Sequence, residues 1–143
     1  MSAIHPTLYP TPLIGWREDV CLPDFDGVML IAKIDTGART AALHADNIRV
    51  SGKHVSFTLE GVGHRVQLVG LKRVKSSNGI SELRPIVETL IQVGMHRFSI
   101  EMTLTDRADM GVPMLLGREA LKGRFVVNPA RSFILSRRKK KTK

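Results

Sequence analysis

The chain has 143 residues, which suits one domain, and 43% of them are hydrophobic although only 5% are aromatic. The formal net charge is +9, but six of the positive charges lie in residues 137–143, which leaves +3 for the rest of the chain and argues against a nucleic-acid-binding face there. The single cysteine, Cys21, excludes an intrachain disulfide and favours a reducing compartment. Neither a signal-peptide pattern nor an apolar stretch of about 20 residues is present. We therefore expect a cytoplasmic protein without a membrane partner.

The first third of the chain predicts two strands after an irregular start. Residues 1–12 contain three prolines and are predicted to be an irregular lead-in. Residues 13–22 predict a first strand, and Asp26-Gly27 is a hairpin-turn signal. Residues 28–34 form a nearly continuous apolar run, which is typical of a buried strand.

An acid follows that apolar run directly. Asp35 stands at the mouth of the strand, where a carboxylate is poorly solvated and needs hydrogen bonds. Thr36 offers a hydroxyl, and the N–H groups of Gly37 and Ala38 are available to face the carboxylate. The pattern predicts one rigidly presented carboxylate. The alternative is a β-turn in which Asp35 only caps its own backbone.

The remainder of the chain alternates between short apolar runs and turn signals. Residues 40–46 fit either a helical turn or an extended segment. Asn78-Gly79 is the strongest hairpin signal, because this pair suits a type I′ turn. Further strands are expected at 55–59, 66–68, 84–93, 97–104, 112–117, 125–127 and 132–135, with the last two forming a hairpin, and helical turns at 118–122. About eight or nine short strands and one short helix argue for an all-β barrel or sandwich.

Two motifs that lie about 80 residues apart carry a resemblance to a known fold. Asp35-Thr36-Gly37-Ala38 and Leu115-Leu116-Gly117-Arg118 together resemble the retropepsin-like aspartic peptidases. With Ser77-Asn78-Gly79 and Leu104-Thr105-Asp106-Arg107 included, the chain is similar to the small bacterial and archaeal family known as ATP-dependent zinc proteases. That family is associated with the RimK-type ATP-grasp ligase that adds glutamate to a ribosomal protein.

The resemblance covers roughly residues 12–136 and implies an all-β fold. The expected architecture is a closed acid-protease (retropepsin-like) barrel with one short helix near the C-terminus. On this interpretation residues 13–136 form the domain, between the lead-in 1–12 and a basic tail at 137–143.

The resemblance also implies a catalytic pair of carboxylates. Aspartic peptidases use two carboxyl groups that share one proton and titrate together. This chain has one Asp-Thr-Gly, and its other candidate aspartates lack the strand-and-glycine context: Asp24, Asp26, Asp46, Asp106 and Asp109. A homodimer is therefore expected, with Asp35 of each subunit in the pair. By analogy Thr36 would lock the two loops together and Gly37 would hydrogen-bond the carboxylates.

A flap that closes over substrate is implied as well. Counting back from Leu115 favours the hairpin tip at 76–79; the rival is 61–63, and both can be ordinary turns. The substrate-binding residues expected from this reasoning are Ala38, Arg39, Asn78, Gly79 and Leu116.

One position departs from the retropepsin pattern. In those enzymes the arginine after the second glycine commonly pairs with an aspartate four positions after the catalytic one. Here the arginine is Arg118, but the matching position is Arg39. We therefore expect Arg118 to pair with another acid, Asp106, Asp109 or Glu119. Arg39 would face an acidic substrate or remain a solvated loop residue.

Zinc and ATP receive little support from the residues themselves. There is no His-Glu-x-x-His motif, and His44, His54 and His64 are ten residues apart, which matches no metal-ligand spacing. A Gly-rich phosphate loop is also missing. We predict no metal and no cofactor, so that any ATP dependence would come from a partner.

Three functions follow as hypotheses. The first is a homodimeric aspartic peptidase that acts on a peptide or protein and is linked to ribosomal-protein glutamylation. The second is a non-catalytic dimeric regulator that binds the glutamate ligase or its substrate. The third, an RNA-binding β-barrel, rests only on the tail at 137–143, for which a solubilising role is the simpler explanation.

Overall fold

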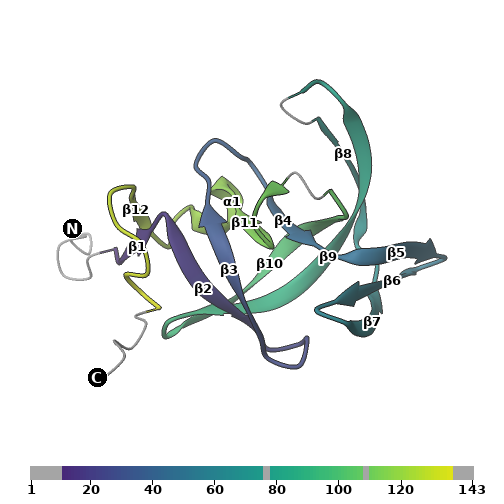
Figure 1. Cartoon of the computed structure of the whole chain (residues 1–143), viewed down its shortest axis with the longest axis horizontal. Helices are drawn as coiled ribbons and strands as arrows, with labels where there is room; N and C mark the ends of the chain where they lie inside the picture. Colours follow the sequence, from purple (N-terminus) through teal and green to yellow (C-terminus); the bar gives the residue numbers. More distant parts are fainter. Residues whose placement is uncertain (1–10, 76–77, 108–109, 137–143) are drawn as a thin grey trace, which may run out of the picture.

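Twelve strands and one short helix make up the part of the chain that the computed structural model describes, residues 11–75, 78–107 and 110–136 (Figure 1). The elements are β1 (Leu13–Gly15), β2 (Arg17–Leu22), β3 (Val28–Ile34), β4 (Ala41–His44), β5 (Asp46–Ser51), β6 (His54–Leu59), β7 (Val62–Gln67), β8 (Gly70–Lys75), β9 (Ser81–Val93), β10 (His96–Thr105), β11 (Met114–Leu116), α1 (Arg118–Leu121) and β12 (Val126–Asn128). Within these ranges no helix has the length and apolar character needed to cross a membrane.

Six strands close into a barrel. They are ordered β10-β4-β11-β3-β2-β9, and β9 pairs back onto β10. Most neighbours are antiparallel, but β11 runs parallel to β3, and β4 runs parallel to β10. β8 extends the sheet beyond β9 and forms a hairpin with it. The predicted all-β barrel with one short C-terminal helix is confirmed.

The barrel interior is aliphatic, as the composition predicts. Its largest fully buried apolar side chains are Ile14, Leu22, Leu43, Ile91, Met102, Leu104, Met114 and Leu116. β3 contributes Leu30, Ala32 and Ile34 to this core, whereas Met29 on the opposite face is 60% exposed. The apolar run at 28–34 is therefore buried on one face only, because the outer side of the barrel wall is open to solvent there.

A separate three-stranded sheet, β5-β6-β7, projects beside the barrel at the right of Figure 1. Its inner face carries Val55, Phe57 and Leu59, which are buried as the alternation predicts. The Phe57 ring meets the Phe25 ring edge-on, with 5.5 Å between centroids, and this contact fastens the small sheet to the β2–β3 turn.

Turn geometry agrees with the sequence at two of three hairpins. The predicted Asp26-Gly27 turn joins β2 to β3, with φ of 59° and 66°. Gly61 lies with Glu60 in a two-residue loop with positive φ at both positions, between the paired residues Leu59 and Val62. The predicted two-residue turn at Asn78-Gly79 is wrong, because Lys75 pairs with Ser81 and the register centres the hairpin on Asn78. That turn includes residues 76–77, which lie outside the described ranges.

Two segments of the first third of the chain can be compared with the sequence prediction. The ambiguous segment 40–46 is extended and supplies β4. The single strand expected at 13–22 is two strands, because the Trp16 N–H bonds the Arg131 carbonyl while its own carbonyl accepts from Ile34.

The predicted C-terminal hairpin of 125–127 with 132–135 is wrong. β12 pairs in parallel with β1, Leu13 opposite Val126, instead of with the following segment. Residues 131–136, called the strap below, form no strand. The N–H groups of residues 133–136 bond the Arg17 carbonyl and the Glu18 carboxylate on β2, so these groups are not available for a ladder with β12.

Candidate active site

Asp35 lies at the end of β3, where the barrel wall gives way to the loop 35–40 at the top of Figure 1. The side chain of Ile34 just before it is buried, so the strand fixes the point at which the acid leaves the core. The Asp35 N–H donates to the Leu116 carbonyl at 2.9 Å. Since β3 and β11 are parallel, both predicted motifs end at the same edge of the barrel.

Gly117 allows the two motifs to dock. A Cβ at this position would lie 2.5 Å from the Thr40 carbonyl oxygen and 2.8 Å from that of Ala38, so no larger residue fits without movement of the loop. The start of α1 then bonds the same loop, with Arg118 N–H donating to the Ala38 carbonyl at 2.8 Å and Glu119 N–H to that of Arg39 at 3.0 Å. Main-chain groups of β11 and of the start of α1 therefore hold the Asp35 loop in place.

The carboxylate itself is lightly constrained. Its Oδ1 accepts from the Gly37 N–H at 2.9 Å, which is the one hydrogen bond to it in the described part of the chain. The Ala38 N–H, expected to face the carboxylate, instead donates to the main-chain carbonyl of Asp35 at 3.2 Å. Asp35 is half-buried, whereas Thr36 and Gly37 are exposed. The Gly37 bond is also what simple backbone capping requires.

The bonding partners of Arg118 and Arg39 differ from those expected from the sequence. Arg118 does not pair with an acid among the described residues; its Nη1 donates to the Thr36 carbonyl at 3.0 Å. Arg39 forms the ion pair instead, with Glu119 at 3.4 Å. The predicted pairing of Arg118 with Asp106 or Glu119 is therefore wrong, because its guanidinium bonds the Thr36 carbonyl and Glu119 pairs with Arg39. Asp109, another proposed partner, lies outside the described ranges.

The β8–β9 hairpin rises at the same end of the molecule as the Asp35 loop (Figure 1). Near its tip, the Asn78 side chain accepts from the Ile80 N–H at 3.3 Å, and Gly79 has φ +88°. The assignment of Asn78 and Gly79 to a substrate-binding flap stays a prediction.

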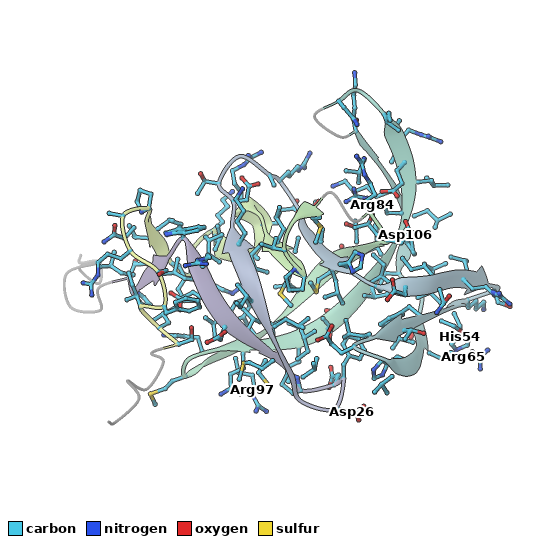
Figure 2. All side chains as sticks on the ribbon, viewed as in Figure 1. Asp26, His54, Arg65, Arg84, Arg97 and Asp106 are labelled. Atoms are coloured by element: carbon cyan, nitrogen blue, oxygen red, sulfur yellow. The ribbon has the colours of Figure 1, made fainter. Side chains whose placement is uncertain are left out.

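Two residues that the sequence did not single out, Glu82 and Arg84, lie on β9 toward the tip of this hairpin, with Glu82 opposite Val74. Glu82 accepts from the Thr105 hydroxyl at 3.1 Å and pairs with Arg84, whose side chain is only 11% exposed. Figure 2 shows Arg84 and Asp106 in this region. Thr105 belongs to the Leu104–Arg107 motif, so this motif contributes a hydrogen bond that holds the hairpin.

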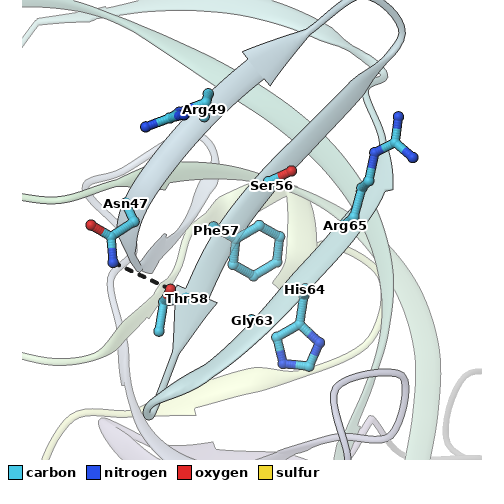
Figure 3. A pocket seen from close by; sticks show the side chains of 8 residues that line it. All are labelled: Asn47, Arg49, Ser56, Phe57, Thr58, Gly63, His64 and Arg65. Carbon is cyan, nitrogen blue, oxygen red and sulfur yellow. Dashed lines mark hydrogen bonds between the residues drawn. The ribbon is translucent and has the colours of Figure 1, made fainter.

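The outer face of the β5-β6-β7 sheet bears an open hollow that is separate from the Asp35 loop (Figure 3). Arg49, Ser56 and Arg65 lie opposite one another across its three strands. Figure 3 shows the two guanidinium groups pointing away from each other, so they do not converge on a common ligand position. The hollow contains none of the predicted site residues.

A zinc site does not fit the donors available. Among the described residues, no three His, Cys, Asp or Glu side chains lie close enough to hold a metal ion. His64 packs against aromatic rings, with centroids 4.9 Å from Phe25 and 5.7 Å from Phe57. We derive no chemical step through a metal.

A closed barrel in which an Asp-Thr-Gly loop docks on an apolar strand ending in Leu-Gly defines the retropepsin-like class. Residues 13–138 match the family model RimB-like, described as retropepsin-like aspartic endopeptidase RimB. The chain belongs to the RimB-like family.

Curated relatives carry the name "Probable alpha-L-glutamate ligase". The one from Shewanella pealeana is 37% identical over 135 residues, which are 86% of this chain and 30% of that protein. The one from Desulfotalea psychrophila is 34% identical over 130 residues, or 82% of this chain and 28% of that protein. The chain thus spans less than a third of the length of these relatives.

A solved structure supports the same fold. The crystal structure of Lpg0085 from Legionella pneumophila, titled as a protein of unknown function, matches with a TM-score of 0.71 and 32% identity. The match covers 87% of this chain and 98% of that one.

Proposed function

We propose that the protein is an aspartic endopeptidase that works as a homodimer. The observation that carries this proposal is the docking of the Asp35 loop on Leu116 and Gly117, with Thr36 and Gly37 left exposed at the end of the barrel. One such loop occurs in the described chain, whereas the reaction needs two carboxylates. A two-fold partner would supply the second Asp35 and cover the exposed loop residues.

In that dimer the two Asp35 carboxyl groups share one proton. Because like charges about 3 Å apart cannot both remain ionised, one carboxyl donates a hydrogen bond while the other removes a proton from the attacking water. The Gly37 N–H supports the ionised form through its bond to Oδ1, and the Leu116 carbonyl fixes the main chain of Asp35. Both contacts are made before substrate arrives, so the geometry is prepared in advance.

The substrate we propose is a glutamate-bearing ribosomal protein in the cytoplasm. The names of the curated relatives support a link to glutamate ligation. Charge supports it too, because β8 of the candidate flap carries Lys72, Arg73 and Lys75. An acidic peptide would be attracted to this end of the barrel.

Cleavage of a defined peptide tests the proposal. The probe is a ribosomal-protein peptide with a C-terminal run of glutamates, and the same peptide with glutamines controls for charge. Asp35→Asn should abolish cleavage, whereas Asp26→Asn should not, since Asp26 is an exposed acid at the other end of β3 (Figure 2). Sedimentation should show a dimer at working concentration. A strictly monomeric enzyme that still cleaves would overturn the dyad.

The second candidate function is a dimeric regulator of a glutamate ligase. It is supported by the span of the match, since this chain corresponds to less than a third of proteins named as ligases. The measurement is ligase turnover with wild-type and Asp35→Asn protein. An equal effect of both on the ligase, with no peptide cleavage by the wild type, favours regulation over proteolysis.

A further inference from the structure

Glu18 is a second notable carboxylate, and it lies outside the candidate active site. It is 0% exposed, on the barrel strand β2, in phase with the buried Val20 and Leu22. No Lys or Arg pairs with it in the described part of the chain. A buried carboxylate of this kind is stable only if hydrogen bonds replace its water shell.

Five donor groups supply those bonds, and four of them belong to the strap. Oε1 accepts from the Ser136 hydroxyl at 2.7 Å and the Ser136 N–H at 2.9 Å. Oε2 accepts from Gly15 N–H at 2.7 Å and Ile134 N–H at 3.0 Å, and the Leu135 N–H lies 3.2 Å from both oxygens. These bonds outweigh burial, which on its own raises the pKa, and they hold the pKa of Glu18 below its ordinary value.

Both oxygens are therefore acceptors only. A glutamine would place its NH₂ group against N–H donors on one side or the other, so it cannot reproduce the arrangement. The Ser136 hydroxyl fits the same logic, because it accepts from the Asp19 N–H at 2.8 Å and donates to Glu18. Four donor groups of the strap thus depend on the ionised form of one side chain.

The strap lies tightly against its surroundings. A Cβ on Gly15 would lie 2.6 Å from the Arg131 carbonyl oxygen, and one on Gly94 would lie 2.8 Å from that of Leu135. Phe133 takes a positive φ of 54°, and its ring receives the Arg17 guanidinium at 5.3 Å. Strain of this kind persists only where neighbouring contacts enforce it.

The strap connects to the residue before the Asp35 loop through the main-chain N–H and carbonyl of Trp16. The Trp16 N–H donates to the Arg131 carbonyl at 2.9 Å, and the Trp16 carbonyl accepts from Ile34 N–H at 2.8 Å. Ile34 immediately precedes Asp35. Arg17 on β2 also lies opposite Lys33 on β3.

We propose that Glu18 is a positioning residue for the Asp35 loop. Its carboxylate clamps the strap onto β2, and the clamped residues 15–19 hold the end of β3 from which Asp35 projects. Release of the strap would loosen that end without any change in the residues of the loop. The importance of this clamp for catalysis rests on the proposed peptidase function, whereas its mechanical effect does not.

Residue-resolved amide hydrogen exchange on the full chain tests the clamp. In Glu18→Gln, exchange at Ile134, Leu135 and Ser136 should rise about 10- to 100-fold, the range expected when bonds to a charged group are lost. Exchange at Ile34 should rise about 10-fold, because its partner Trp16 is loosened. Glu88→Gln removes an exposed carboxylate from β9 and should leave both regions within about twofold of the wild type.

Two results would overturn the proposal. One is faster exchange in the strap with Ile34 unchanged, which would make the strap a local attachment only. The other is no change in the strap itself. If Glu18→Gln does not fold, Ser136→Ala removes one of the five donors, and the same comparison of strap with Ile34 applies. Because no substrate is needed, lack of peptidase activity would contradict the proposed function and leave this measurement intact.

Discussion

Asp35 and Glu18 lie on neighbouring strands of one barrel, yet their surroundings differ sharply. Glu18 is fully buried and accepts from five donor groups, whereas Asp35 is half-exposed and, among the described residues, its carboxylate accepts only from the Gly37 N–H. A carboxylate whose oxygens are all bonded can hold structure, but it is harder to protonate and has no free acceptor site for a substrate. One that keeps free acceptor sites can do chemistry. The contrast separates a structural acid from a candidate catalytic acid without reference to either sequence motif.

The largest expected effect on stability belongs to Glu18. Glu18→Gln should lower the free energy of unfolding by about 3 kcal/mol, because buried N–H donors lose a charged acceptor. Urea unfolding measures the difference, with Glu88→Gln as the control for loss of one carboxylate charge. A loss equal to that of Glu88→Gln would show that the strap contributes little to the native state.

The docking of the Asp35 loop should be nearly as sensitive. Gly117→Ala places a methyl group against the Thr40 and Ala38 carbonyls, and we expect a loss of about 2 kcal/mol from the resulting displacement. Gly63→Ala is a fair comparison, since a Cβ there would meet nothing within 4 Å. If both variants unfold at the same urea concentration, the loop and the β11–α1 junction are not tightly docked.

Acidification should weaken the contribution of Glu18 to stability. Because folding lowers the pKa of Glu18, the unfolded chain binds more protons than the native one as the pH falls below about 4.3, the ordinary glutamate value. The contribution of Glu18 is thus complete above that pH and is lost as the pH drops through the folded pKa. Unfolding curves at several pH values should show a steeper decline for the wild type than for Glu18→Gln. Parallel declines would contradict the clamp.

The sequence predicted what depends on local pattern. Alternation and turn residues were enough for an all-β barrel or sandwich. The closed barrel followed only from the resemblance that the motifs at Asp35 and Leu116-Gly117 carry. Glu18 was missed although a signal existed, since it is in phase with Val20 and Leu22 on a strand predicted to be half-buried. A charged residue at such a position points to a buried network.

The failures came from long-range competition for hydrogen bonds. Residues 132–135 look like a strand because three of the four are apolar, but the N–H groups of residues 133–135 bond acceptors on β2 more than a hundred residues earlier. Arg118 was expected to pair with an acid because guanidinium groups usually do so, but its side chain donates to the Thr36 carbonyl instead. In both cases the partner lies far away in the sequence, so the residues around the donor do not predict the bond.

The smallest expected effect on stability is the most informative for function. Asp35→Asn should change the free energy of unfolding by less than about 0.5 kcal/mol, because an amide oxygen can still accept from the Gly37 N–H and the site is half-exposed. A neutral or slightly stabilising result would mean that the fold does not need this acid, so its presence has to be explained by what it does to a ligand. A loss as large as that of Glu18→Gln would instead assign Asp35 to backbone capping, and the distinction between the two carboxylates would fail.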